Sequence, residues 1–68
     1  MTVYTFAYRF LDREWHRGRL VSNLPTAEVF AEKLAELPQN EPTDEIRVWT
    51  GDDTERAPDA TVRREVRS

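Results

Sequence analysis

Thr2-Val-Tyr-Thr-Phe-Ala-Tyr-Arg-Phe10 is the stretch that decides the fold. Its side chains alternate in type with the two-residue period of a β-strand. Four aromatic residues fall on one face: Tyr4, Phe6, Tyr8 and Phe10. Alternation of this kind predicts a strand over residues 2–10 whose aromatic face lies in the core.

The other extended segments are shorter. Residues 15–21 are predicted to form a second strand, joined to the first by a polar hairpin loop. Residues 45–50 alternate cleanly and predict a third strand, and residues 51–59 are rich in turn residues and predict a loop. Residues 61–67 fit either a fourth, edge strand or a charged tail.

A helix is predicted over residues 26–37. Thr26 is suited to cap its N-terminus, and Pro38 ends it. Apolar side chains recur with helical spacing on one face: Ala27, Phe30, Ala31, Leu34 and Leu37.

The element order β-β-α-β-(β) predicts an α+β fold in a single small domain, residues 1–68. We expect a mostly antiparallel sheet with one helix packed on one face. The order resembles that of the immunoglobulin-binding domains of protein G and, more broadly, the β-grasp folds. The resemblance includes the helix opening Thr26-Ala-Glu-Val-Phe30 and an aromatic strand with Trp49 ahead of an acidic turn. It implies topology and no function, because no functional motif is shared.

The pairing register of the first hairpin determines which side chains remain outside the core. If Phe10 lies opposite Trp15, the arginines of the second strand join the aromatic face. Burying them without partners would cost several kcal/mol each. We therefore expect Phe10 opposite His16. This register buries Leu20 with the aromatic residues.

The expected register has two further consequences. Gly18 would lie beside Tyr8, and an aromatic neighbour is a known way to stabilise a glycine in a strand. Arg9 would lie directly opposite Arg17, a mildly destabilising pair of like charges.

The outer sheet face is expected to be basic and to bear both tryptophans. Ile46 and Val48 are predicted to point into the core, together with Val62 and Val66. The residues left outside are the candidate binding residues: Trp15, Trp49, Arg9, Arg17, Arg19, Arg47 and Arg63. Arginine binds carboxylates and phosphates in a bidentate manner, and tryptophan stacks on bases and on guanidinium groups.

The net charge of −3 is then the sum of a basic sheet face and an acidic helix-and-loop surface. That acidic surface is an alternative binding site, suited to a basic protein. Its residues are Glu28, Glu32, Glu36, Asp52, Asp53 and Glu55.

Several kinds of chemistry find no support in the residues. The chain has no Cys, and residues 52–55 lack the alternating ligands and internal Gly of a calcium loop, so no metal is expected. His16 is the sole histidine, and no nucleophile has a base at a recognisable spacing. We therefore expect neither catalysis nor a cofactor nor a small-molecule substrate. No secretory signal or membrane-spanning run is visible, so a cytoplasmic location is expected.

The sequence favours a non-enzymatic interaction protein that binds a protein partner, or a second copy of itself, through the outer face. Small chains of this kind, including phage-encoded ones, act as inhibitors, adaptors or regulators. Nucleic-acid binding by the same face is an alternative, disfavoured by the negative net charge.

Overall fold

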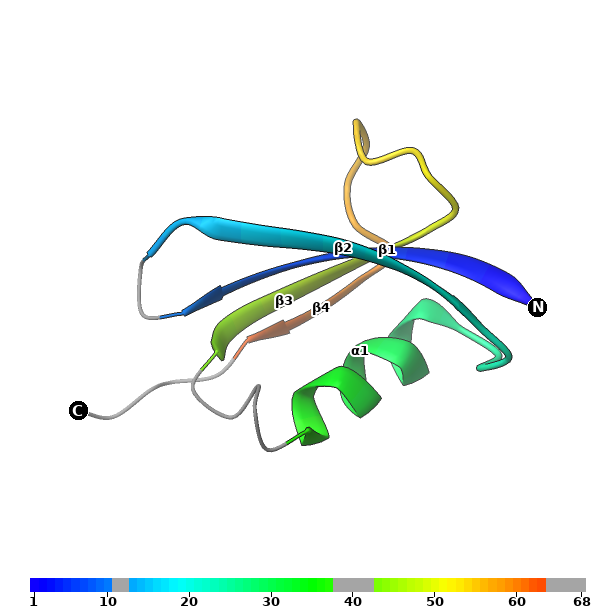
Figure 1. The fold of residues 1–68 in the computed structure, drawn as a ribbon, viewed down its shortest axis with the longest axis horizontal. Coiled ribbons are helices and arrows are strands. Elements are labelled where there is room, and N and C mark those ends of the chain that lie inside the picture. Colours follow the sequence, from blue (N-terminus) through cyan, green and yellow to red (C-terminus); the bar gives the residue numbers. More distant parts are fainter. Residues whose placement is uncertain (11–12, 38–42, 64–68) are drawn as a thin grey trace.

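The structure, a computed structural model, describes residues 1–10, 13–37 and 43–63. Four strands and one helix follow each other along the chain (Figure 1). They are β1 (Thr2–Phe10), β2 (Trp15–Ser22), α1 (Ala27–Glu36), β3 (Thr43–Thr50) and β4 (Ala60–Arg63). The α+β fold with one helix on one face of an antiparallel sheet is confirmed. The segment predicted as strand or tail begins as a strand, and Val66 lies outside the described residues.

The sheet has the order β2-β1-β3-β4, and every neighbouring pair is antiparallel. Because β2 and β3 both run opposite to β1, their connection must cross β1, and α1 lies in this connection on one face of the sheet (Figure 1). The pairing of β1 with β3, rather than with the last strand, limits the resemblance to the β-grasp folds to the order of elements.

The core lies between the sheet and α1. Tyr4, Ile46 and Val48 are fully buried there, as expected from the alternation of their strands. The ring of Tyr4 stacks on Phe30 at 4.7 Å between centroids, and its hydroxyl donates to the carbonyl of Leu24 at 2.8 Å. The strand is therefore tied both to the helix and to the segment that leads into it.

The helix begins where the sequence predicts. The Thr26 side chain accepts a hydrogen bond from the Val29 N–H at 3.2 Å, which confirms the N-cap. Phe30 and Ala31 are buried, whereas Leu37 caps the C-terminus and is exposed, so its place on the apolar face was wrong. Among the described residues, no helix is long and apolar enough to cross a membrane.

The first hairpin pairs with a register two residues away from the expected one. Phe6, not Tyr8, lies opposite Gly18, and Tyr8 lies opposite His16. A shift of two keeps every side chain on its expected face. The Phe6 ring lies directly over Gly18, where an added Cβ would be 2.4 Å from the ring, and it also approaches Phe30 at 6.0 Å. The absence of a side chain at Gly18 therefore makes room for this ring.

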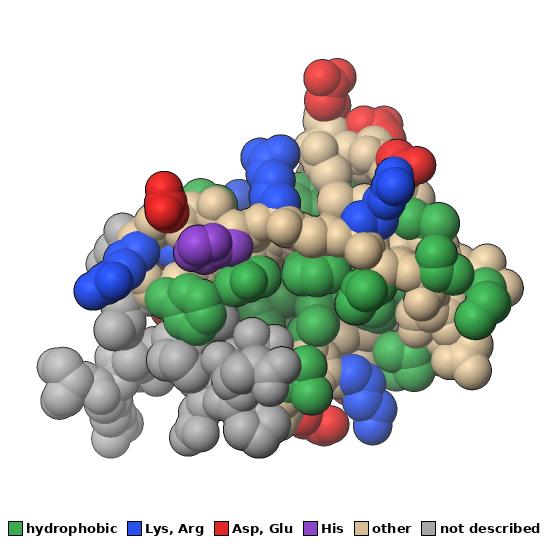
Figure 2. Space-filling view, in the orientation of Figure 1, with side chains coloured by type: hydrophobic (Ala, Val, Ile, Leu, Met, Phe, Trp, Pro, Cys, Tyr) green, Lys and Arg blue, Asp and Glu red, His purple; other side chains and the backbone are tan. Residues whose placement is uncertain are grey.

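The helix covers only part of the inner face, because α1 packs on β3 and β4. Leu20 on β2 was predicted to be buried and is 51% exposed, since none of the described helices and strands lies over its half of the sheet. Phe6 and Tyr8 are half-buried for the same reason. Figure 2 shows the resulting band of hydrophobic side chains between β2 and α1.

Candidate functional site

The predicted arginines do share the outer sheet face, opposite α1. Arg17 lies opposite Ala7, and Arg19 lies opposite Thr5, so both alternate with the inward residues of β2. Arg47 pairs with Ala7 from the other side, and Arg63 on β4 lies opposite Glu45. The sheet thus brings arginines from all four strands to one face.

Trp15 stacks on two of these arginines. The expected like-charge pair was wrong, because Arg9 lies opposite Trp15 and not opposite Arg17. The Cζ of Arg9 is 5.2 Å from the Trp15 ring, and the Cζ of Arg47 is 4.4 Å from it. Cation–π contacts of this kind contribute about 0.5–1 kcal/mol each at exposed sites. The contacts with the two guanidinium groups favour the orientation in which the indole lies.

Glu45 also lies on this face, although it is not among the predicted binding residues. Its side chain is nearly buried, and the residue is only 7% exposed. Its carboxylate binds the Nε atoms of Arg47 and Arg63, the latter at 3.3 Å. Asp44, its neighbour, binds the Nε of Arg9 at 3.3 Å. The strand alternation that places Arg47 on the outer face also places Glu45 there. The position of Glu45 could therefore be predicted from the sequence.

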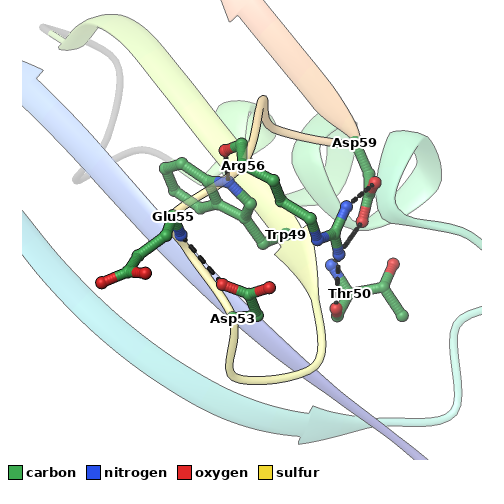
Figure 3. A network of polar contacts seen from close by, with 6 residues as sticks. All are labelled: Trp49, Thr50, Asp53, Glu55, Arg56 and Asp59. Atoms are coloured by element: carbon green, nitrogen blue, oxygen red, sulfur yellow. Dashed lines mark hydrogen bonds and ion pairs between the residues drawn. The ribbon is translucent and has the colours of Figure 1, made fainter.

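Trp49 lies on the outer face but is not available to a partner, so its predicted exposure was wrong. It is 7% exposed, because the loop between β3 and β4 folds over it. The indole Nε1–H donates to the carbonyl of Arg56 at 2.8 Å (Figure 3). A buried indole whose N–H is hydrogen-bonded within the chain fits a structural role.

A charged contact within the loop helps to hold it closed over Trp49. Arg56 binds both carboxylate oxygens of Asp59, at 2.6 and 3.0 Å, and donates to the Thr50 carbonyl at 2.9 Å (Figure 3). Asp59 also accepts the Thr50 N–H at 2.6 Å. The hydrogen bonds from Arg56 and Thr50 hold the pKa of Asp59 well below its usual range.

The same loop carries its acidic residues onto the basic side of the sheet. Thr5 on β1 donates to the carbonyl of Gly51 at 2.6 Å, and Arg19 binds Asp52 at 2.8 Å. Figure 1 shows the loop and α1 on opposite sides of the sheet. The acidic surface is therefore not continuous, and the expected separation of a basic face from an acidic remainder was wrong. Asp52, Asp53 and Glu55 lie on one side of the sheet and Glu28, Glu32 and Glu36 on the other.

Two of the helix glutamates line a groove between α1 and β4. Glu28 and Glu32 face Asp59 and Val62 across it. Within the described part of the chain, no three or more His, Asp or Glu side chains are arranged to hold a metal ion. His16 is exposed and stacks on Tyr8 at 5.4 Å between ring centroids.

The side chains that remain available are concentrated on β2. No ion pair joins Arg17 to any described residue, and Arg19 has only its mainly exposed contact with Asp52. Leu20 and Val21 are 51% and 58% exposed, respectively. Together with the half-buried Trp15, they make β2 the richest strand in uncovered apolar and basic side chains. Searches against protein-family models, curated proteins and solved structures gave no match.

Proposed function

We propose that this chain is a non-enzymatic binding protein for another protein and that it binds through the outer sheet face beside Trp15. The supporting observation is the ring of Trp15, held against Arg9 and Arg47 on the same face as Arg17 and Arg19. Tryptophan and arginine are the residues most enriched at interaction hot spots. A ring that is already oriented loses little entropy on binding. A protein that acts by contact in this way would serve as an inhibitor, an adaptor or a regulator.

A protein fits this face better than a nucleic acid. Carboxylates of Asp44, Glu45 and Asp52 lie among the arginines and offset much of their positive charge. A phosphate backbone is bound by uniformly positive surfaces, whereas protein interfaces combine both signs of charge. The chain's net charge of −3 adds a long-range repulsion for nucleic acid.

The test compares variants on opposite sides of the sheet. Immobilised wild-type chain is used to capture partners from extracts of the source cells, beside Trp15→Ala and Glu32→Ala. Glu32 is an exposed residue of α1, on the opposite side of the sheet from Trp15. We expect a captured protein to be lost with Trp15→Ala and retained with Glu32→Ala, while circular dichroism shows both variants folded.

Two results would overturn the proposal. One is capture that is unaffected by Trp15→Ala but abolished by Glu32→Ala, which would assign binding to the acidic helix face. The other is retention of nucleic acid, sensitive to nuclease and to salt, with no protein captured. A second copy of the chain is the remaining candidate partner. Sedimentation of the chain at low micromolar concentration tests for this self-association.

A further inference from the structure

The strand β2 forms one edge of the described sheet. The order β2-β1-β3-β4 leaves its outer side unpaired by any described strand. It spans eight residues, Trp15–Ser22, without a proline, whereas the opposite edge strand β4 has four residues and follows Pro58 closely. Backbone N–H and C=O groups along such an edge are a template for another strand. Of the two described edge strands, β2 is the longer and offers the longer run of backbone groups to an added segment.

The two faces of β2 are complementary to different side chains of an added strand. The outer row carries Arg17 and Arg19, both exposed. The inner row carries Leu20 and His16, and it continues the half-buried aromatic face of β1 that α1 leaves uncovered. Side chains directly opposite in neighbouring strands interact, and opposite charges stabilise the pair. Acidic residues would therefore match the outer row, and apolar residues the inner row.

A second copy of the chain matches this edge poorly in the two face-aligned registers that pair the most residues of β2. Two β2 strands paired about a twofold axis keep their outer rows on the same face. In the register with Gly18 opposite Gly18, each Arg17 would face an Arg19. In the next register that keeps the faces aligned, Arg19 would face Arg19. Like charges directly opposite one another are destabilising. The ion pair of Arg19 with Asp52, both mainly exposed, offers little compensation.

We infer that β2 binds an extended segment of the partner by strand addition, and that this segment alternates acidic with apolar residues. The acidic side chains lie opposite Arg17 and Arg19, and the apolar ones extend the face formed by Leu20 and the aromatic residues of β1. This inference rests on the proposed function and specifies the chemistry of its partner.

The test uses synthetic peptides of about ten residues, long enough to span the strand. The first has Glu at every second position with Val or Phe between them. The second replaces each Glu by Lys, and the third has the composition of the first with its Glu residues grouped at one end. Fluorescence anisotropy gives the affinities, and amide hydrogen exchange locates the protected residues. The chain is wild type, Arg17→Glu/Arg19→Glu or Arg17→Gln/Arg19→Gln.

We expect the alternating Glu peptide to bind wild type and to protect amides of β2. The charge-reversed variant should lose about tenfold or more in affinity and should instead bind the Lys peptide, with the Gln variant between them. Equal binding of the grouped peptide, protection on β4, or no binding of any peptide would overturn the inference. If no peptide binds, the role left for Arg17 and Arg19 is to prevent unwanted pairing of the sheet edge. A dimer that buries β2 without peptide would also overturn it.

The outcomes separate the inference from the function on which it rests. Capture that depends on Trp15 while no peptide binds β2 would leave the proposed function standing and remove strand addition. Peptide binding together with capture that is indifferent to Trp15 would remove the proposed function.

Discussion

Trp15 and Arg47 are in contact although their strands are not neighbours. The Arg47 Cζ lies 4.4 Å from the Trp15 ring centroid, and β1 separates β2 from β3. The residue of β1 opposite Arg47 is Ala7, which is buried on this outer face. A side chain as small as alanine lets Trp15 and Arg47 meet over the central strand, so the outer face has a small packed layer of its own.

This contact should appear as a coupling between the two side chains. Trp15→Leu and Arg47→Gln, alone and together, form a double-mutant cycle measured by urea unfolding. We expect a coupling free energy of about 0.5–1 kcal/mol, the range of exposed cation–π pairs. The matched control is Arg17→Gln, since the arginines that lie over the ring among the described residues are Arg9 and Arg47. Coupling of Trp15 to Arg17 as large as to Arg47 would contradict the geometry.

The two tryptophans should differ in both accessibility and stability. Trp49→Phe leaves Trp15 as the fluorophore, and Trp15→Phe leaves Trp49. Acrylamide should quench Trp15 several-fold more strongly, because Trp49 is 7% exposed beneath its loop. Trp49→Ala should cost about 3–5 kcal/mol, enough to unfold a domain of this size, while Trp15→Ala leaves it folded. Similar quenching of both tryptophans would show that the loop does not cover Trp49.

Alternation predicts the face of each residue but not what covers that face. The sequence placed Ile46 inside and Arg47 outside correctly, because a strand has only two faces. It could not show that α1 covers β3 and β4 but leaves Leu20 exposed. Nor could it show that the loop over Trp49 returns to the outer face, since that depends on contacts between distant residues. The predicted register was wrong by two residues because alternation is equally consistent with every even shift.

Gly18→Ala should destabilise the hairpin. An added Cβ would lie 2.4 Å from Phe6 Cζ, and the ring cannot move freely because it packs near both Tyr8 and Phe30. We expect a loss of about 1–3 kcal/mol in chemical unfolding, the usual range for overpacking. Combining it with Phe6→Leu should recover part of the loss. No recovery would mean that the cost arises from the backbone and not from the ring.

Glu45→Gln should destabilise the fold by more than the small change in side-chain size suggests. The carboxylate is shielded from solvent and binds Arg47 and Arg63 together, and glutamine can accept hydrogen bonds without neutralising either charge. We expect thermal unfolding to show a loss of about 1–3 kcal/mol. Glu55→Gln is the control, because Glu55 is exposed in the loop. An equal effect of both substitutions would place the loss outside this contact.

Asp59→Asn should change how stability depends on pH. The contacts with Arg56 and Thr50 lower the pKa of Asp59 in the folded chain, so its ionised form stabilises the fold above the ordinary carboxyl pKa of about 3.9. That stabilisation is lost as the pH falls from this value through the folded pKa. Wild type should therefore exceed the variant in stability by a constant amount between about pH 5 and 7, and the difference should shrink below about pH 4. Chemical unfolding at several pH values measures it, and Arg56→Gln, which removes the same ion pair from its other side, should also reduce the pH dependence. A difference that stays constant down to about pH 2 would show that the ionised carboxylate does not hold the loop closed.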